Sequence, residues 1–75
     1  MDELLRILTK LHPDVDFTGR ADLIDAGVLD SFDIISLVAE VDSVFDVRIP
    51  AEEIVPENFN SAVALYAMIQ RLADE

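Results

Sequence analysis

The sequence predicts an all-α fold, a small four-helix bundle made of three longer helices and one short helix. Three stretches of the chain repeat their apolar residues at helical spacing, which is typical of helices that bury one face. Alternating apolar residues, the signal of a strand, extend only over residues 47–49. The 75 residues are close to the lower size limit for a stable core, so residues 1–75 are expected to form a single domain.

The first helix is predicted at the start of the sequence, before Pro13. Acidic residues in its first turn and Lys10 near its end suit the helix dipole, and Pro13 ends it. Residues 12–30 then form a long connection, with two glycines and scattered aspartates that break any regular period. A connection of this length in a compact domain usually has a function. The apolar residues that define the first helix are Leu4, Leu5, Ile7, Leu8 and Leu11.

The second helix is predicted from about Ser31 to Asp46. On a wheel with about 100° per residue, six apolar residues form a stripe roughly 120° wide that is expected to face the core: Ile34, Leu37, Val38, Val41, Val44 and Phe45. A second apolar strip lies on the opposite side, where packing in a small bundle does not require it: Phe32, Ile35 and Ala39. Acidic residues flank this second strip: Asp33, Glu40, Asp42 and Asp46. The strip and its acidic edge predict a surface that partner proteins contact.

The rest of the chain predicts one short and one longer helix. Pro50 is expected to open a short helical turn that runs to Ile54, because proline is well tolerated at a first helical position. Pro56 is expected to interrupt the chain before a last helix that begins near Asn60 or Ser61. That helix is expected to bury Ala62, Leu65, Ile69 and Leu72.

The charge of the chain limits its possible partners. The net charge is −11, and residues 21–60 contain ten acidic residues against the single base Arg48. This charge repels nucleic acids and anionic membranes, and it favours partners with a basic face. The absence of cysteine excludes disulfides and thiolate metal sites, and it fits a reducing compartment. With neither a basic-then-apolar leader nor an apolar run long enough to span a bilayer, we expect a cytoplasmic monomer.

A calcium-binding module is the alternative from another class of function. Residues 14–25 have the layout of an EF-hand loop, with Gly19 at position 6. Asp25 is shorter than the usual final glutamate, Ala21 is small for its position, and Gly27 arrives too early for an exit helix. We therefore expect no metal site, although the loop remains the alternative. Its oxygen-bearing residues are Asp14, Asp16, Thr18, Asp22 and Asp25.

Independent catalysis is not expected. A nucleophilic Ser31 needs a base, and the only histidine, His12, precedes Pro13 in a turn. The sequence has no Gly-x-Ser-x-Gly elbow, no glycine-rich phosphate loop and no histidine cluster for zinc. Two interpretations of Ser31 remain. Either Asp30 or Ser31 simply caps the second helix, since Asp30 and Asp33 have capping-box spacing, or the hydroxyl is presented for a group to be attached.

The sequence resembles the acyl carrier protein family over nearly its whole length. The resemblance rests on Leu29-Asp30-Ser31-Phe32-Asp33 at the start of an acidic second helix, followed by Phe45-Asp46 and Ile49-Pro50 at the expected distances. It implies that Ser31 is esterified by 4′-phosphopantetheine from coenzyme A, whose thiol then carries acyl groups as thioesters. Asp30 would engage the phosphopantetheinyl transferase and its magnesium. The other implied partners are loading enzymes and acyl-processing enzymes of fatty acid or related biosynthesis.

Departures from the family pattern leave the cargo open. Phe32 stands where common fatty-acid carriers have leucine, and Ser36 and Ser43 stand where they often have glutamate. Residues 27–32, Gly-Val-Leu-Asp-Ser-Phe, are also similar to the D-alanyl carriers, although those typically have glycine at the position of Asp33. A D-alanyl or other aminoacyl carrier is therefore the alternative to a fatty-acyl carrier.

Overall fold

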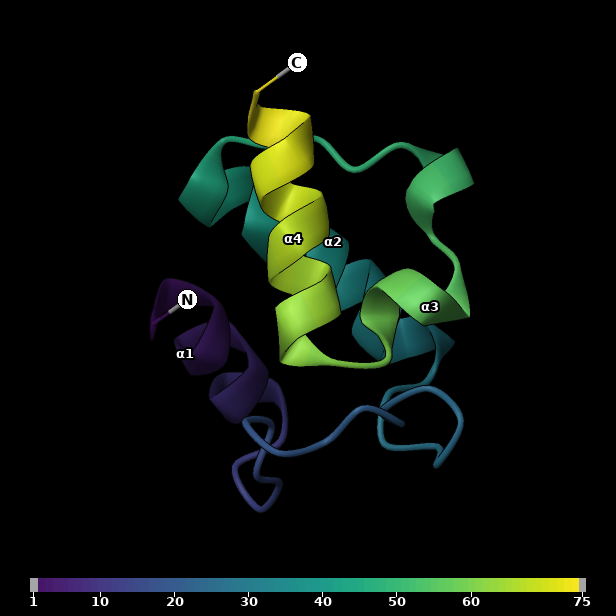
Figure 1. Cartoon of the computed structure of the whole chain (residues 1–75). Coiled ribbons are helices and arrows are strands. Elements are labelled where there is room, and N and C mark those ends of the chain that lie inside the picture. Colours follow the sequence, from purple (N-terminus) through teal and green to yellow (C-terminus); the bar gives the residue numbers. More distant parts are fainter. Residues whose placement is uncertain (1, 75) are drawn as a thin grey trace.

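The computed structural model describes residues 2–74 (Figure 1). Within these residues the chain is helical, without strands, and measures 32 × 22 × 21 Å. The predicted all-α bundle is confirmed. Its elements, in chain order, are α1 (Asp2–Leu11), α2 (Ser31–Phe45), the 3-10 turn η1 (Ala51–Glu53), α3 (Pro56–Phe59) and α4 (Ala62–Ala73).

The three longer helices enclose one core. α1 contacts both α2 and α4, and the short α3 contacts α4. Figure 1 shows α4 crossing in front of α2, with α1 and α3 on opposite sides of the start of α4. The long connection, residues 12–30, runs along the end of the bundle at which α2 begins. It adds buried side chains of its own to the core, namely Phe17, Leu23 and Leu29.

The burial of α2 follows the predicted wheel with one exception. Leu37 and Val41 are fully buried, and three further residues of the stripe are half-buried against the core: Ile34, Val38 and Phe45. Val44 was expected on the core face but is 44% exposed, because it lies in the last turn and at one edge of the stripe. Asp46, in the left-handed conformation (φ 56°), ends the helix.

The segment after α2 differs from the prediction. Residues 51–53 form a 3-10 turn rather than an α-helix, with Pro50 just before it. Pro56 does not interrupt the chain but opens α3, where its missing N–H is not needed and Val55 before it is extended. Phe59 at the end of α3 is fully buried and fixes this turn of helix against α4.

The last helix begins where the sequence predicts. Ser61 caps α4, and its hydroxyl accepts a hydrogen bond from the backbone N–H of Ala64 at 3.0 Å. Leu72 is only half-buried, whereas Met68, which was not expected in the core, is 2% exposed. The other expected core residues of this helix, Ala62, Leu65 and Ile69, are buried. No helix within residues 2–74 has the length and hydrophobicity that crossing a membrane requires.

The charge distribution predicts a fold that salt stabilises. The ion pairs given by the structure of residues 2–74 are Lys10–Glu40, His12–Asp33, Arg20–Asp22 and Arg71–Glu53, and most of the acidic residues in this range lie outside these four pairs. We expect the melting temperature to rise by several degrees between about 10 mM and about 150 mM salt, because the screening length falls from roughly 30 to 8 Å. Thermal melts followed by circular dichroism measure this, and a flat or falling curve would contradict it.

Candidate functional site

The start of α2 is held by a complete capping box. Asp30 is extended (φ −103°, ψ −177°), and its Oδ1 accepts a hydrogen bond from the backbone N–H of Asp33 at 2.9 Å. The Oδ2 of Asp33 in turn accepts one from the backbone N–H of Asp30 at 3.3 Å. Each acidic side chain thus satisfies a backbone donor of the other residue. Asp30, and not Ser31, is therefore the cap of this helix.

This arrangement leaves the Ser31 hydroxyl unused. Ser31 is the first residue of α2 and is exposed, and its side chain makes no hydrogen bond within the described part of the chain. The backbone N–H groups of Ser31 and Phe32 lie in the first turn, where a helix offers them no acceptor. The positive end of the helix dipole points at the same place. A negatively charged group on the Ser31 oxygen would therefore meet unpaired donors and a favourable field.

Asp33 has a further partner that the sequence did not reveal. The Nε2 atom of His12 donates to the Oδ2 atom of Asp33 at 2.7 Å, across 21 positions of the chain. Burial raises the pKa of Asp33, but the hydrogen bonds from His12 and from the backbone of Asp30 outweigh it, so the pKa lies below its ordinary value. The pKa of Asp33 is thus lower in the folded than in the unfolded chain. These hydrogen bonds therefore stabilise the fold at pH values above the pKa of Asp33 in the unfolded chain. Their contribution is lost as the pH falls through the pKa of Asp33 in the folded chain.

Asn60 fixes the connection just before the site. Its side-chain oxygen accepts from the backbone N–H of Ile24 at 2.9 Å and of Asp25 at 3.2 Å, and its backbone oxygen accepts from Leu23 at 2.9 Å. The N–H of Leu29 donates to the backbone oxygen of Leu23 at 2.9 Å, and both leucine side chains are buried. The chain therefore reaches Asp30 from an anchored position. In the sequence, Asn60 stands out only as a possible helix start.

Gly27 allows the chain to turn between these anchors. Its φ of 75° lies in the left-handed region, which other residues adopt only with strain. Its N–H donates to the backbone oxygen of Ile24 at 3.0 Å and closes the turn.

The calcium-loop residues do not converge. Asp16 accepts hydrogen bonds from the backbone and hydroxyl of Thr18, which is a local turn. Asp22 pairs with Arg20 at 3.1 Å, and Asp25 accepts from the side chain of Asn60 at 3.4 Å. Residues 2–74 contain no group of three or more His, Cys, Asp or Glu side chains arranged to hold a metal ion. The carboxylates of Asp16, Asp22 and Asp25 thus each have a separate local partner.

The apolar strip predicted beside Ser31 is exposed. Phe32 is 74% exposed and Ile35 68% exposed, and Ala39 is exposed further along the same side of α2. The acidic edge of the strip is less uniform. Glu40 lies 3.7 Å from the ammonium of Lys10 on α1, and Asp42 is exposed.

The carboxylate of Asp33, another of the four acids expected at this edge, is bonded inside the molecule to His12 and Asp30. That partners contact this face of α2 stays a prediction.

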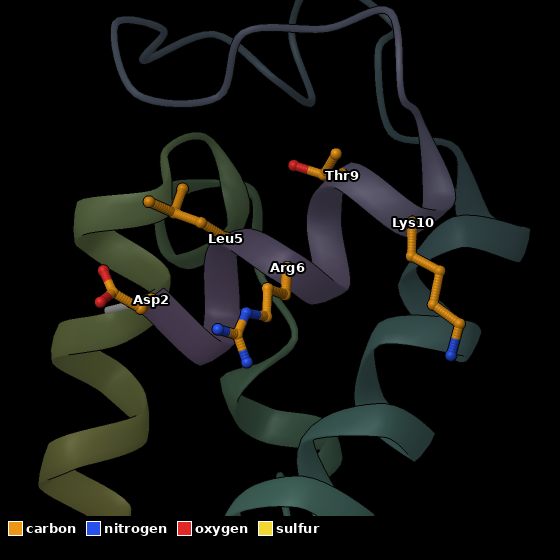
Figure 2. Close-up of a pocket in the computed structure, with 5 residues that line it drawn as sticks. All are labelled: Asp2, Leu5, Arg6, Thr9 and Lys10. Carbon is orange, nitrogen blue, oxygen red and sulfur yellow. The ribbon is translucent and has the colours of Figure 1, made fainter.

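Two hollows of the surface lie on other elements. An open hollow of about 510 Å³ follows the outer side of α1 and is drawn in Figure 2, with Lys10 at the end nearest α2. A smaller one of about 230 Å³ lies where α1 meets the connection and the start of α4. Neither is lined by residues of α2. The candidate site is the exposed Ser31 hydroxyl at the start of α2, and neither of these two hollows includes it.

The chain matches known proteins over most of its length. Residues 2–69 match the family model described as "Phosphopantetheine attachment site". The chain is similar to the D-alanyl carrier protein of Streptococcus equi subsp. zooepidemicus (strain MGCS10565), with 39% identity over 59 residues that cover 79% of this chain and 75% of the relative. It is similar to the same extent to the D-alanyl carrier protein of Streptococcus equi subsp. equi (strain 4047).

Proposed function

This chain belongs to the phosphopantetheine-binding carrier family, and we propose that it carries an aminoacyl group, D-alanine being the first candidate, on an arm attached to Ser31. Its prosthetic group is 4′-phosphopantetheine, which supplies the thiol that holds the cargo as a thioester and that this cysteine-free chain lacks. The observation that carries the assignment to Ser31 is the unused hydroxyl at the first position of α2.

The residues around Ser31 fit a phosphate ester. When the ester forms, the Ser31 oxygen loses its proton and bonds to the phosphorus that carries the pantetheine, while the pyrophosphate bond of coenzyme A breaks and adenosine 3′,5′-bisphosphate leaves. No internal hydrogen bond of Ser31 has to break first. The N–H groups of Ser31 and Phe32 are available to the ester oxygens at the positive end of α2. Asp30 keeps the helix start in place through the capping box. By resemblance to the acyl carriers, Asp30 also faces the transferase and its magnesium.

Two observations support an aminoacyl cargo. The relatives at 39% identity are named D-alanyl carrier proteins. An aminoacyl thioester also has a free ammonium group, and the net charge of −11 attracts cations. The relatives named above give no support to the fatty-acyl cargo expected from the resemblance to acyl carriers. The partners proposed are therefore a phosphopantetheinyl transferase, an aminoacyl-loading enzyme and an acceptor enzyme, each with a basic docking face. The cytoplasmic location and monomeric state expected from the sequence stay predictions.

The cargo is tested by comparing the rates of two separate loading reactions. The phosphopantetheinylated protein is incubated with ATP and either D-alanine and a D-alanine-activating enzyme or a fatty acid and a fatty-acyl-activating enzyme, and the intact mass is followed over time. We expect D-alanine to load faster by about tenfold or more, a difference of about 1.4 kcal/mol in activation free energy. The unmodified protein is the control and should accept neither group. Faster loading of the fatty acid would overturn the aminoacyl assignment while leaving the carrier role intact.

A further inference from the structure

His12 joins the two ends of the long connection. It follows α1 directly, and its backbone N–H donates to the backbone oxygen of Leu8 at 3.0 Å, so its own position is held by that helix. Its side chain crosses to the first turn of α2, where Nε2 donates to the Oδ2 of Asp33 at 2.7 Å. The pair is mostly covered, with 32% of the His12 side chain and 15% of the Asp33 side chain exposed. A covered, short and charge-assisted hydrogen bond is stronger than an exposed one.

The oxygen that His12 contacts belongs to the capping box. Asp33 Oδ2 accepts the backbone N–H of Asp30 at 3.3 Å, which is long for an N–H···O bond, and accepts His12 at 2.7 Å. The closer partner, His12, therefore does most to fix the rotamer of Asp33. Ser31 lies between the two residues of the box, so the box sets the backbone geometry from which its hydroxyl projects.

Loss of His12 would act on this geometry without touching Ser31. A mostly covered carboxylate that loses its nearest donor turns toward water, because an unpaired buried charge is unfavourable. Asp33 could then no longer accept from Asp30, and half of the capping box would open. The first turn of a helix frays readily when its capping groups are released.

We propose that His12 is a positioning residue for Ser31: through Asp33 it holds the capping box, and thereby keeps the Ser31 hydroxyl aligned for attachment of the arm. The inference rests on the proposed function, since it concerns the same attachment. It adds a residue 19 positions before Ser31 whose side chain bonds to Asp33.

The test measures how fast a phosphopantetheinyl transferase modifies the full chain with coenzyme A. For His12→Ala we expect kcat to fall by about five- to tenfold, the effect of losing one such hydrogen bond. KM should change by less than about twofold, because the exposed strip is intact. His12→Gln should recover most of the rate, since its side-chain amide keeps a donor at this position. Arg20→Ala is the matched control, because it breaks an ion pair within the same connection, 3.1 Å long, that does not reach α2.

A double variant of His12 and Asp33 shows whether His12 positions Ser31 through Asp33 or only stabilises the fold. If His12 acts through Asp33, the double variant His12→Ala/Asp33→Ala should be no slower than Asp33→Ala alone. A wild-type kcat for His12→Ala, at a temperature where circular dichroism shows it folded, would overturn the proposal, as would additive effects in the double variant. If wild-type protein is never modified, the proposed function itself fails, and this inference falls with it.

Discussion

Ser31→Ala is expected to abolish attachment of phosphopantetheine completely and to leave the helical content unchanged. The hydroxyl is the group that would be esterified, and alanine offers no oxygen in its place. The fold is expected to be unaffected, because the Ser31 side chain makes no internal hydrogen bond and Asp30 remains as the cap. Removing a serine that caps a helix lowers the free energy of unfolding by about 1 kcal/mol. Ser31 does not cap α2, so no such decrease is expected. Intact mass after incubation with coenzyme A and a transferase, together with circular dichroism, measures both results.

Ser43→Ala is the matched control for this experiment. Ser43 lies on the same helix and is exposed, but it is three turns away from the helix start. The variant should be modified as fast as wild type. Modification of Ser31→Ala, or modification of wild type at Ser43, would show that the arm is attached elsewhere.

The helices could be predicted because their signals are local. Each longer helix repeats apolar residues within a few positions, and the capping box of α2 spans only Asp30 to Asp33. Ser31 could also be identified from a local signal, since the motif around it, residues 29–33, is contiguous. The misjudged α3 also had a local signal. Pro56 suits a first helical position just as Pro50 does, but a four-residue helix shows no apolar period that would reveal it.

The contacts that position the site could not be predicted. Asn60 binds the backbone of residues 24 and 25 from 35 or more positions away, and His12 reaches Asp33 across 21 positions. Neither contact has a periodicity or a spacing rule behind it, because both depend on how the connection folds across the end of the bundle. The exposure of Val44 could not be predicted either, because it also depends on packing between elements. The helical wheel gives the direction of the Val44 side chain, but not whether another element covers the end of α2.

Ile35→Arg is expected to keep the fold and to lower kcat/KM for arm attachment by about tenfold or more. Ile35 is 68% exposed, so an arginine there remains hydrated and the core is unaffected. The substitution removes an apolar contact beside Ser31 and places a positive charge against a partner surface that is expected to be basic. Reduced rates at unchanged helical content, measured by circular dichroism and transferase kinetics, would identify the strip of Phe32, Ile35 and Ala39 as a docking surface.

Two arginine variants show whether location or charge causes this effect. Val41 lies on the core face of the same helix and is fully buried, whereas Val38 is only half-buried and makes a weaker comparison. Val41→Arg buries an unpaired charge at a penalty of several kcal/mol, which exceeds the stability expected of so small a domain, and it should unfold the protein. Val63 on α4 is 67% exposed, nearly the same as Ile35, but belongs to another face. Val63→Arg should therefore be folded and modified at the wild-type rate. If Ile35→Arg is modified as fast as Val63→Arg, partners do not dock on this strip, and its exposure has another cause.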